Sequence, residues 1–157
     1  PMADNYPGTC FLHLVNIPFH EAGHIIFSPF GEVVRSLGGS LAQLLVPAIC
    51  LLVFLTKSRD TFGAAVSLWW FGENFMDIAP YINDARAREL PLLGGNTGMT
   101  APYGFHDWEF VLTESGWLRY DHILASAAHK IGIFLMILSL LWAGYLIFKQ
   151  YLNLDRK

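Results

Sequence analysis

The chain has 157 residues, of which 54% are hydrophobic and only 15% are charged. Soluble domains usually carry roughly 25% charged residues. The formal net charge is -3 and Lys and Arg form no cluster, so a nucleic-acid partner is excluded. The composition instead predicts one integral membrane domain over residues 1–157, in contact with membrane lipid.

Three of the apolar segments lie in the first half of the chain. The first two are predicted to be membrane spans because of their length and hydropathy. Residues 9–30 are long enough to span a bilayer, although they include His13 and Asn16, and Pro18 is expected to bend or interrupt the helix. Residues 37–55 contain no charged residue and are predicted to span it.

The third predicted span, residues 62–82, carries the polar side chains of Glu73, Asn74 and Asp77. Such groups are costly in hydrocarbon unless they face protein, water or a metal ion. We therefore expect this helix to turn a polar stripe towards a partner inside the membrane.

A long loop, residues 83–129, separates the third span from the last one, residues 131–148. Loops of this size are usually functional. Asp107 is expected to cap a short helix that runs to Glu114. The predicted fold is thus all-α, a polytopic membrane helical bundle with about four spans and a long loop between the third and the fourth.

A His-Glu-x-x-His motif lies in the first span, formed by His20, Glu21 and His24. Two imidazoles four residues apart share one face of a helix and can bind one metal ion, typically Zn²⁺, with the glutamate beside them as general base. The structural alternative is that these side chains are hydrogen-bonded inside a helical bundle without a metal.

A catalytic zinc site needs a third protein ligand and keeps its fourth position for water. The polar residues Asn74, Asp77, Tyr81 and Asp84 recur at intervals of three and four, so they form one stripe. Asp84 and His106 are the candidates for the third ligand, since a loop histidine beside an acid and aromatic residues can fold back over the site. Asp77 is predicted either to bind the metal or to hydrogen-bond to a ligand histidine.

The motif is followed by a small-residue segment at the start of the second span, residues 38–43, with the sequence GGSLAQ. Together they resemble the site-2-protease family of intramembrane zinc metalloproteases. In that family a Gly-Pro-x-Ala-Asn segment follows the first motif, and a later Asn-x-x-Pro...Leu-Asp-Gly segment supplies the third ligand. Residues 74–84 resemble the later segment, so the resemblance implies Asp84 as that ligand. Gln43 and Ala85 stand where the family has Asn and Gly.

The function predicted from these features is that of an intramembrane zinc metalloprotease acting on a membrane-embedded substrate. Glu21 would activate water, and Asn74 or Gln43 would donate a hydrogen bond to the carbonyl oxygen in the transition state. The alternative is a non-catalytic, metal-stabilised or metal-free accessory subunit of a larger membrane protein complex. The number of zinc ligands distinguishes the protease from the accessory subunit, because a structural zinc site is closed by four protein ligands. A transporter or channel is a third class, and the lack of an internal repeat in the sequence counts against it.

Overall fold

The computed structural model describes residues 10–154, which are mainly helical with no β-strand among them. An isolated β-bridge between Pro91 and Thr97 lies in the long loop. The predicted all-α class is therefore confirmed for this part of the chain. The α-helices are α1 (Phe11–Phe27), α2 (Glu32–Val53), α3 (Thr61–Asn83), α4 (Asp107–Glu114) and α5 (Asp121–Leu154).

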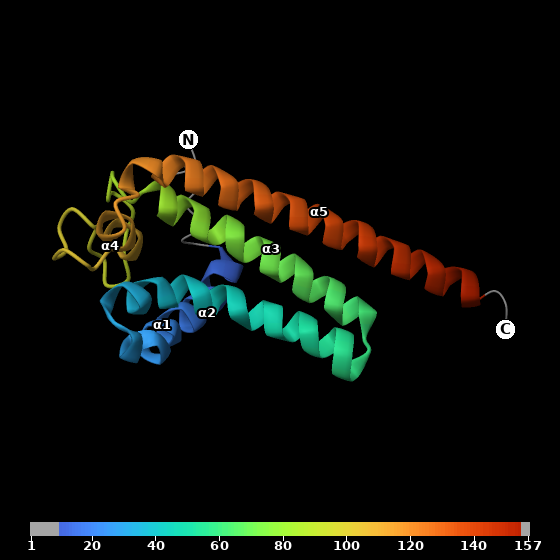
Figure 1. Ribbon diagram of the computed structural model, residues 1–157. Helices are drawn as coiled ribbons and strands as arrows, with labels where there is room; N and C mark the ends of the chain where they lie inside the picture. The colour runs from blue at the N-terminus through green and yellow to red at the C-terminus, as the bar shows by residue number, and fades with distance from the viewer. Residues whose placement is uncertain (1–9, 155–157) are drawn as a thin grey trace.

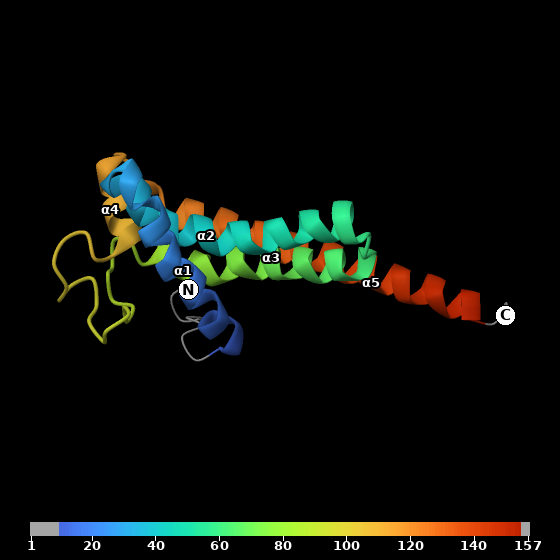
Figure 2. The ribbon, with the colours of Figure 1, turned by 90° about the horizontal axis from the view of Figure 1, so that it is seen from below.

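The three long helices α2, α3 and α5 run side by side along the long axis of the molecule (Figure 1). α1 crosses α2 obliquely, and α4 with the long loop lies at the end where α2 begins and α3 ends (Figures 1 and 2). At the opposite end, α5 projects beyond the turn that joins α2 to α3. The molecule thus has one end that carries the loop and one that consists of helix ends alone.

The crossing of α1 over α2 is a direct backbone contact, made possible by glycine. A methyl group on Gly38 of α2 would lie 2.9 Å from the backbone oxygen of Gly23 and 2.7 Å from Cβ of Phe27. Any larger residue would push the helices apart. α1 is continuous through Pro18, so the predicted interruption there does not occur. The histidine-bearing face of α1 is consequently held close to α2.

Two helical segments are long and apolar enough to cross a membrane. They are Glu32–Ser58, in which a π-helical turn extends α2, and Leu118–Asn153, which contains all of α5 except its last residue. α1 and α3 do not meet the same combined criterion of length and composition. The structure supports two candidate spans, and the arrangement with four spans stays a prediction.

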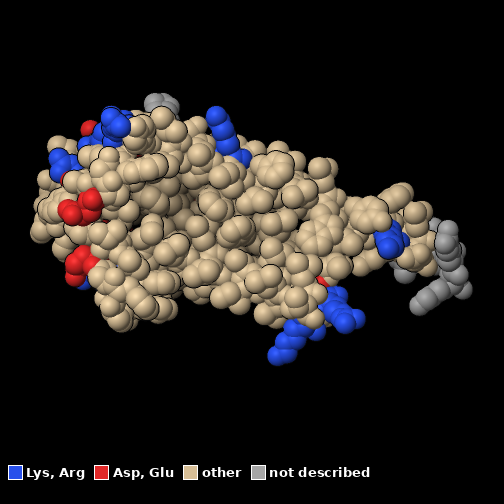
Figure 3. All heavy atoms as spheres, in the orientation of Figure 1, with Lys and Arg blue, Asp and Glu red and all other residues tan. Residues whose placement is uncertain are grey.

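Polar side chains are buried and apolar ones are exposed to an unusual degree. The largest fully buried side chains include His106, Asn16, Asn74, Asp84 and Asp121. Many large apolar side chains of α2 and α5 are exposed, and Figure 3 shows charged side chains mainly at the two ends of the molecule. An extended apolar exterior is unfavourable in water, whereas it is expected where lipid covers the surface.

The last helix begins earlier than predicted, at Asp121 instead of residue 131, so the final part of the expected loop is its first turns. The short helix after residue 106 is confirmed as α4, but its N-cap is His106 and not Asp107. A cluster of buried apolar residues joins α3, α4 and α5, formed by Ile78, Ala79, Ile82, Ala85, Leu112, Ala125 and Ala128. This cluster fixes α4 against the end of the bundle.

Candidate metal centre

The two histidines of the motif meet a carboxylate from α4. Nε2 of His20 lies 3.3 Å and Nε2 of His24 lies 3.4 Å from Oδ2 of Asp107. The ligand atoms of these three residues all lie within 4.8 Å of one another, which makes them a group that could hold a metal ion. The spacing of four residues along α1 brings the imidazoles together, and the loop brings the carboxylate from 83 residues further along the chain.

These distances are compatible with one tetrahedral ion. Bonds of about 2.0–2.1 Å to nitrogen and oxygen place any two ligand atoms of a tetrahedral zinc about 3.3–3.4 Å apart. The two measured separations between imidazole nitrogen and carboxylate oxygen, 3.3 and 3.4 Å, match that edge length. The third separation, between the two histidine nitrogens, is within 4.8 Å. Two of the three edges of the group therefore have the length expected for a tetrahedral ion.

The hydrogen bonds behind the histidines fix which ring nitrogen carries the proton. Nδ1 of His24 lies 2.9 Å from the backbone oxygen of Arg35, which can only accept, so this Nδ1 donates. Nδ1 of His20 lies 3.1 Å from Oε1 of Gln43. Gln43 donates its Nε2 to Oδ2 of Asp77 at 2.6 Å, which fixes the orientation of the amide and makes His20 Nδ1 a donor as well.

With both Nδ1 atoms protonated, a neutral imidazole presents only a lone pair at Nε2. Two such lone pairs and the carboxylate of Asp107 then face one another with no proton between them. Such a group is unfavourable unless the rings become imidazolium or a cation lies between the three atoms. Ligand histidines in metal sites typically donate the second ring N–H to a carbonyl or carboxylate, as His20 and His24 do.

Gly39 of α2 leaves the room that the two imidazoles occupy. A Cβ at this position would lie 2.5 Å from Nε2 of His20 and 2.7 Å from Nε2 of His24. The nitrogens that face Asp107 are therefore pressed against the backbone of α2. The small-residue segment noticed in the sequence has this steric role at the site.

The three residues line a cleft of about 1000 Å³ at the loop end of the molecule. Its walls come from α1, the first half of α2, the end of α3 and the loop between α3 and α4. Glu21 is exposed and lines the same cleft, beside both histidines in the sequence. The wall formed by the loop and α4 is largely apolar, with Leu90, Pro91, Leu92, Leu93 and Phe105 from the loop and Phe110 from α4. Space for a ligand exists next to the group.

Tyr81 of α3 holds Asp107 in this position. Its hydroxyl accepts the backbone N–H of Asp107 at 3.0 Å and lies 3.3 Å from Oδ2 of the same residue. Burial of Asp107 opposes its ionisation, but in the metal-free protein hydrogen bonds from the imidazolium forms of His20 and His24 outweigh this effect and lower the pKa of the carboxyl below its usual value. Asp107 is thus a carboxylate at neutral pH, as a metal ligand must be.

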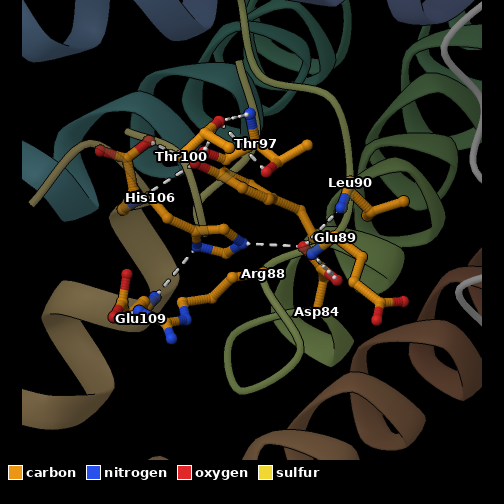
Figure 4. A network of polar contacts seen from close by, with 10 residues as sticks. Asp84, Arg88, Glu89, Leu90, Thr97, Thr100, His106 and Glu109 are labelled. Atoms are coloured by element: carbon orange, nitrogen blue, oxygen red, sulfur yellow. Dashed lines mark hydrogen bonds and ion pairs between the residues drawn. The ribbon is translucent and has the colours of Figure 1, made fainter. Parts of the chain in front are cut away.

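Asp84 and His106, the two predicted third ligands, are paired with each other and are not part of this group. Nε2 of His106 lies 3.2 Å from Oδ2 of Asp84, and both side chains are almost fully buried (Figure 4). Asp84 also accepts the backbone N–H groups of Glu89 and Leu90, each at 3.0 Å. His106 accepts the N–H of Glu109 at 3.1 Å through Nδ1, so its Nε2 carries the proton that it donates to Asp84. The pair anchors the loop and the start of α4.

Of the polar stripe predicted for α3, Asp77 is the residue that hydrogen-bonds to α1 and α2. Oδ1 of Asp77 lies 2.8 Å from Nδ1 of His13, and its Oδ2 accepts from Asn16 and Gln43. Asp77 therefore reaches His20 only through Gln43, and neither of its two predicted roles is seen. Asn74 is fully buried, donates to the backbone oxygen of Trp70 at 2.9 Å, and does not line the cleft.

Comparison with known proteins gives no family. No protein-family model matches the chain, and no curated protein or solved structure is similar to it. The resemblance to site-2 proteases thus stays an expectation based on short motifs.

Sequence reasoning did not identify Asp107 as a member of the group. It expected Asp107 to cap α4, because an acid at a helix start has that common role. The one available signal was its position beside His106 in a loop long enough to return to the motif. Tyr81 and Gln43 were noticed as polar residues, but their contacts with Asp107 and His20 follow only from the structure.

Proposed function

We propose that this chain is an integral membrane zinc metallohydrolase that cleaves a peptide bond in a membrane-embedded substrate. The observation that carries the proposal is the group of His20, His24 and Asp107, whose lone pairs converge on one point of a cleft that also exposes Glu21. Three protein ligands beside open space are the arrangement of a catalytic zinc site, whereas a structural site has four protein ligands.

A membrane location is supported by the two candidate spans and by the apolar exterior. α1 and α3 would also lie in the membrane, because their polar side chains are turned inwards while Phe11, Leu14, Ile25 and Ile26 of α1 are exposed. The cleft would then lie near one membrane surface, since Gly39 is close to the start of α2. A substrate would reach it where lipid meets water.

In the proposed hydrolysis, His20, His24 and Asp107 bind the metal and Glu21 transfers the proton. A zinc ion bound to the three ligands would polarise the substrate carbonyl and lower the pKa of a water molecule. The carboxylate of Glu21 accepts a proton from the attacking water while the water oxygen forms its bond to the carbonyl carbon. Glu21 then passes this proton to the amide nitrogen as the carbon–nitrogen bond breaks, so a carboxylic acid and an amine leave.

Metal content tests the site itself. The detergent-purified protein should contain about one equivalent of zinc by elemental mass spectrometry, and His24→Ala should lose it. His122→Ala is the matched control, because His122 is exposed and bonded to Asn83 outside the cleft. A folded wild type without stoichiometric metal would contradict the proposal.

Turnover tests the role of Glu21. We would incubate the zinc-loaded protein with synthetic transmembrane peptides in micelles and identify products by mass spectrometry. Glu21→Gln should keep the metal and lose the cleavage, because an amide cannot accept the proton. Glu32→Gln is the control, since Glu32 also lines the cleft but is paired with Arg35. Cleavage that survives in Glu21→Gln would exclude this residue as the general base.

A second candidate function is that of an accessory subunit in a larger membrane protein complex. It is favoured by the C-terminal end of α5, which projects beyond the other helices. Apolar side chains in the second half of this helix, such as Leu141, Tyr145 and Phe148, are also exposed. In that case a cobalt-loaded sample should keep its visible spectrum when azide is added, because a closed coordination sphere has no free position. A spectral change with azide would favour the enzyme.

A further inference from the structure

The transition state of peptide hydrolysis places negative charge on the carbonyl oxygen, which needs a hydrogen-bond donor besides the metal. Neither residue that the sequence suggested for this task is free to serve. Gln43 is held between His20 and Asp77, and Asn74 is buried away from the cleft. The donor must come from another side chain at the cleft surface.

Tyr81 brings a hydroxyl group to the edge of the ligand group. This oxygen is 3.3 Å from Oδ2 of Asp107, the same atom that lies 3.3 and 3.4 Å from the histidine nitrogens. It also accepts the backbone N–H of Asp107 at 3.0 Å, which uses a lone pair and leaves the hydroxyl proton to be donated. Tyr81 lines the cleft together with the three ligand residues.

Two histidine rings lie near the ring of Tyr81. Its centroid lies 4.4 Å from that of His106 and 6.3 Å from that of His20. His106 is itself immobilised by Asp84 and Glu109. The hydroxyl is therefore held in place before any ligand binds, and such preorganisation is the property that makes a donor effective in a transition state.

We propose that Tyr81 is a catalytic residue that donates a hydrogen bond to the substrate oxygen as negative charge develops on it. The inference rests on the proposed function. In the metal-free protein the hydroxyl proton is directed at Oδ2 of Asp107. A cation bound to that oxygen would make it a weaker acceptor, and the hydroxyl proton of Tyr81 would then be available to an anionic oxygen in the cleft. No bond other than this hydrogen bond forms or breaks at Tyr81.

The test uses Tyr81→Phe, which removes the hydroxyl and keeps the ring. Tyr103→Phe is the matched control, because Tyr103 also lines the cleft but donates its hydroxyl to Glu114. Each protein is loaded with cobalt and titrated with acetohydroxamate, an oxyanion ligand, and with imidazole, a neutral nitrogen ligand. Visible absorption gives both dissociation constants, and cobalt content gives the stoichiometry.

We expect Tyr81→Phe to keep one metal equivalent and to bind acetohydroxamate about ten- to a hundredfold more weakly, since a hydrogen bond to a charged group is lost. Imidazole affinity should change less than about twofold, and Tyr103→Phe should match the wild type for both ligands. Unchanged acetohydroxamate binding in Tyr81→Phe would overturn the proposal. Loss of metal in that variant would also overturn it, because Tyr81 would then only position Asp107. A wild type that holds no metal would instead refute the proposed function, and this inference with it.

Discussion

Replacing Gly39 by alanine should abolish metal binding while the helices stay intact. The new Cβ would lie 2.5 Å from Nε2 of His20 and 2.7 Å from Nε2 of His24, whereas ordinary contacts begin at 3.4 Å. The nearer imidazole must therefore move by about 0.9 Å, the difference between 3.4 and 2.5 Å. Metal sites tolerate changes in bond length of only about 0.2 Å.

A displacement of that size removes at least one histidine from the coordination sphere. We expect the zinc dissociation constant to rise by at least about a hundredfold, the upper end of the loss found when a ligand loses its supporting contacts. Competition with a chromophoric chelator measures this constant directly. Helix content, measured by circular dichroism, should stay the same, because alanine is a better helix former than glycine.

Gly144→Ala is the matched control. Gly144 lies in α5, where a Cβ would meet no atom within 4 Å. The substitution should leave zinc affinity unchanged and stabilise the helix by roughly 0.5–1 kcal/mol. If Gly39→Ala bound zinc as the wild type does, the histidine nitrogens could not lie against α2 as described, and the steric reasoning would be refuted.

Three further predictions concern the residues around the group. Asp107→Asn should lower zinc content below half an equivalent, since a neutral amide is a poor zinc ligand, and full occupancy in elemental analysis would exclude Asp107 as the third ligand. Gln43→Leu leaves Nδ1 of His20 without its acceptor, so zinc affinity should fall about ten- to a hundredfold; an unchanged ¹⁵N spectrum of the His20 ring would argue against this. His106→Ala removes the α4 cap and leaves Asp84 without its buried partner, at a cost of at least about 1 kcal/mol. Chemical denaturation of the metal-free protein measures that loss, and equal stability would show that the pair does not anchor the loop.

The helices could be predicted from the sequence because each leaves a long apolar or periodic run. The motif residues His20 and His24 were predictable for the same reason, since a spacing of four places both on one helical face. The polar stripe of α3 was expected to face the motif helix, and it does so through Asp77. Local patterns of this kind depend only on neighbours in the chain.

The third member of the group was not predictable in this way. Asp107 reaches the histidines because the loop folds back over the end of the bundle, and no periodicity encodes that return. Sequence reasoning selected Asp84 and His106 as candidate metal ligands, although these residues pair with each other. The early start of α5 was missed because its first turn contains the polar residues Asp121 and His122, which were assigned to the loop.

The location of Asp107 has a consequence for substrate binding. Two of the proposed ligands lie on helix α1, while the third begins α4 and follows the loop that forms a wall of the cleft. Metal binding and loop docking would therefore be thermodynamically linked, and the linkage would be reciprocal. A substrate that binds only when the loop is displaced would lower the affinity for zinc, and bound zinc would lower the affinity for that substrate by the same factor. A substrate that fits beneath the docked loop would raise the affinity for zinc. Zinc affinity measured with and without a substrate would show which of the two cases applies.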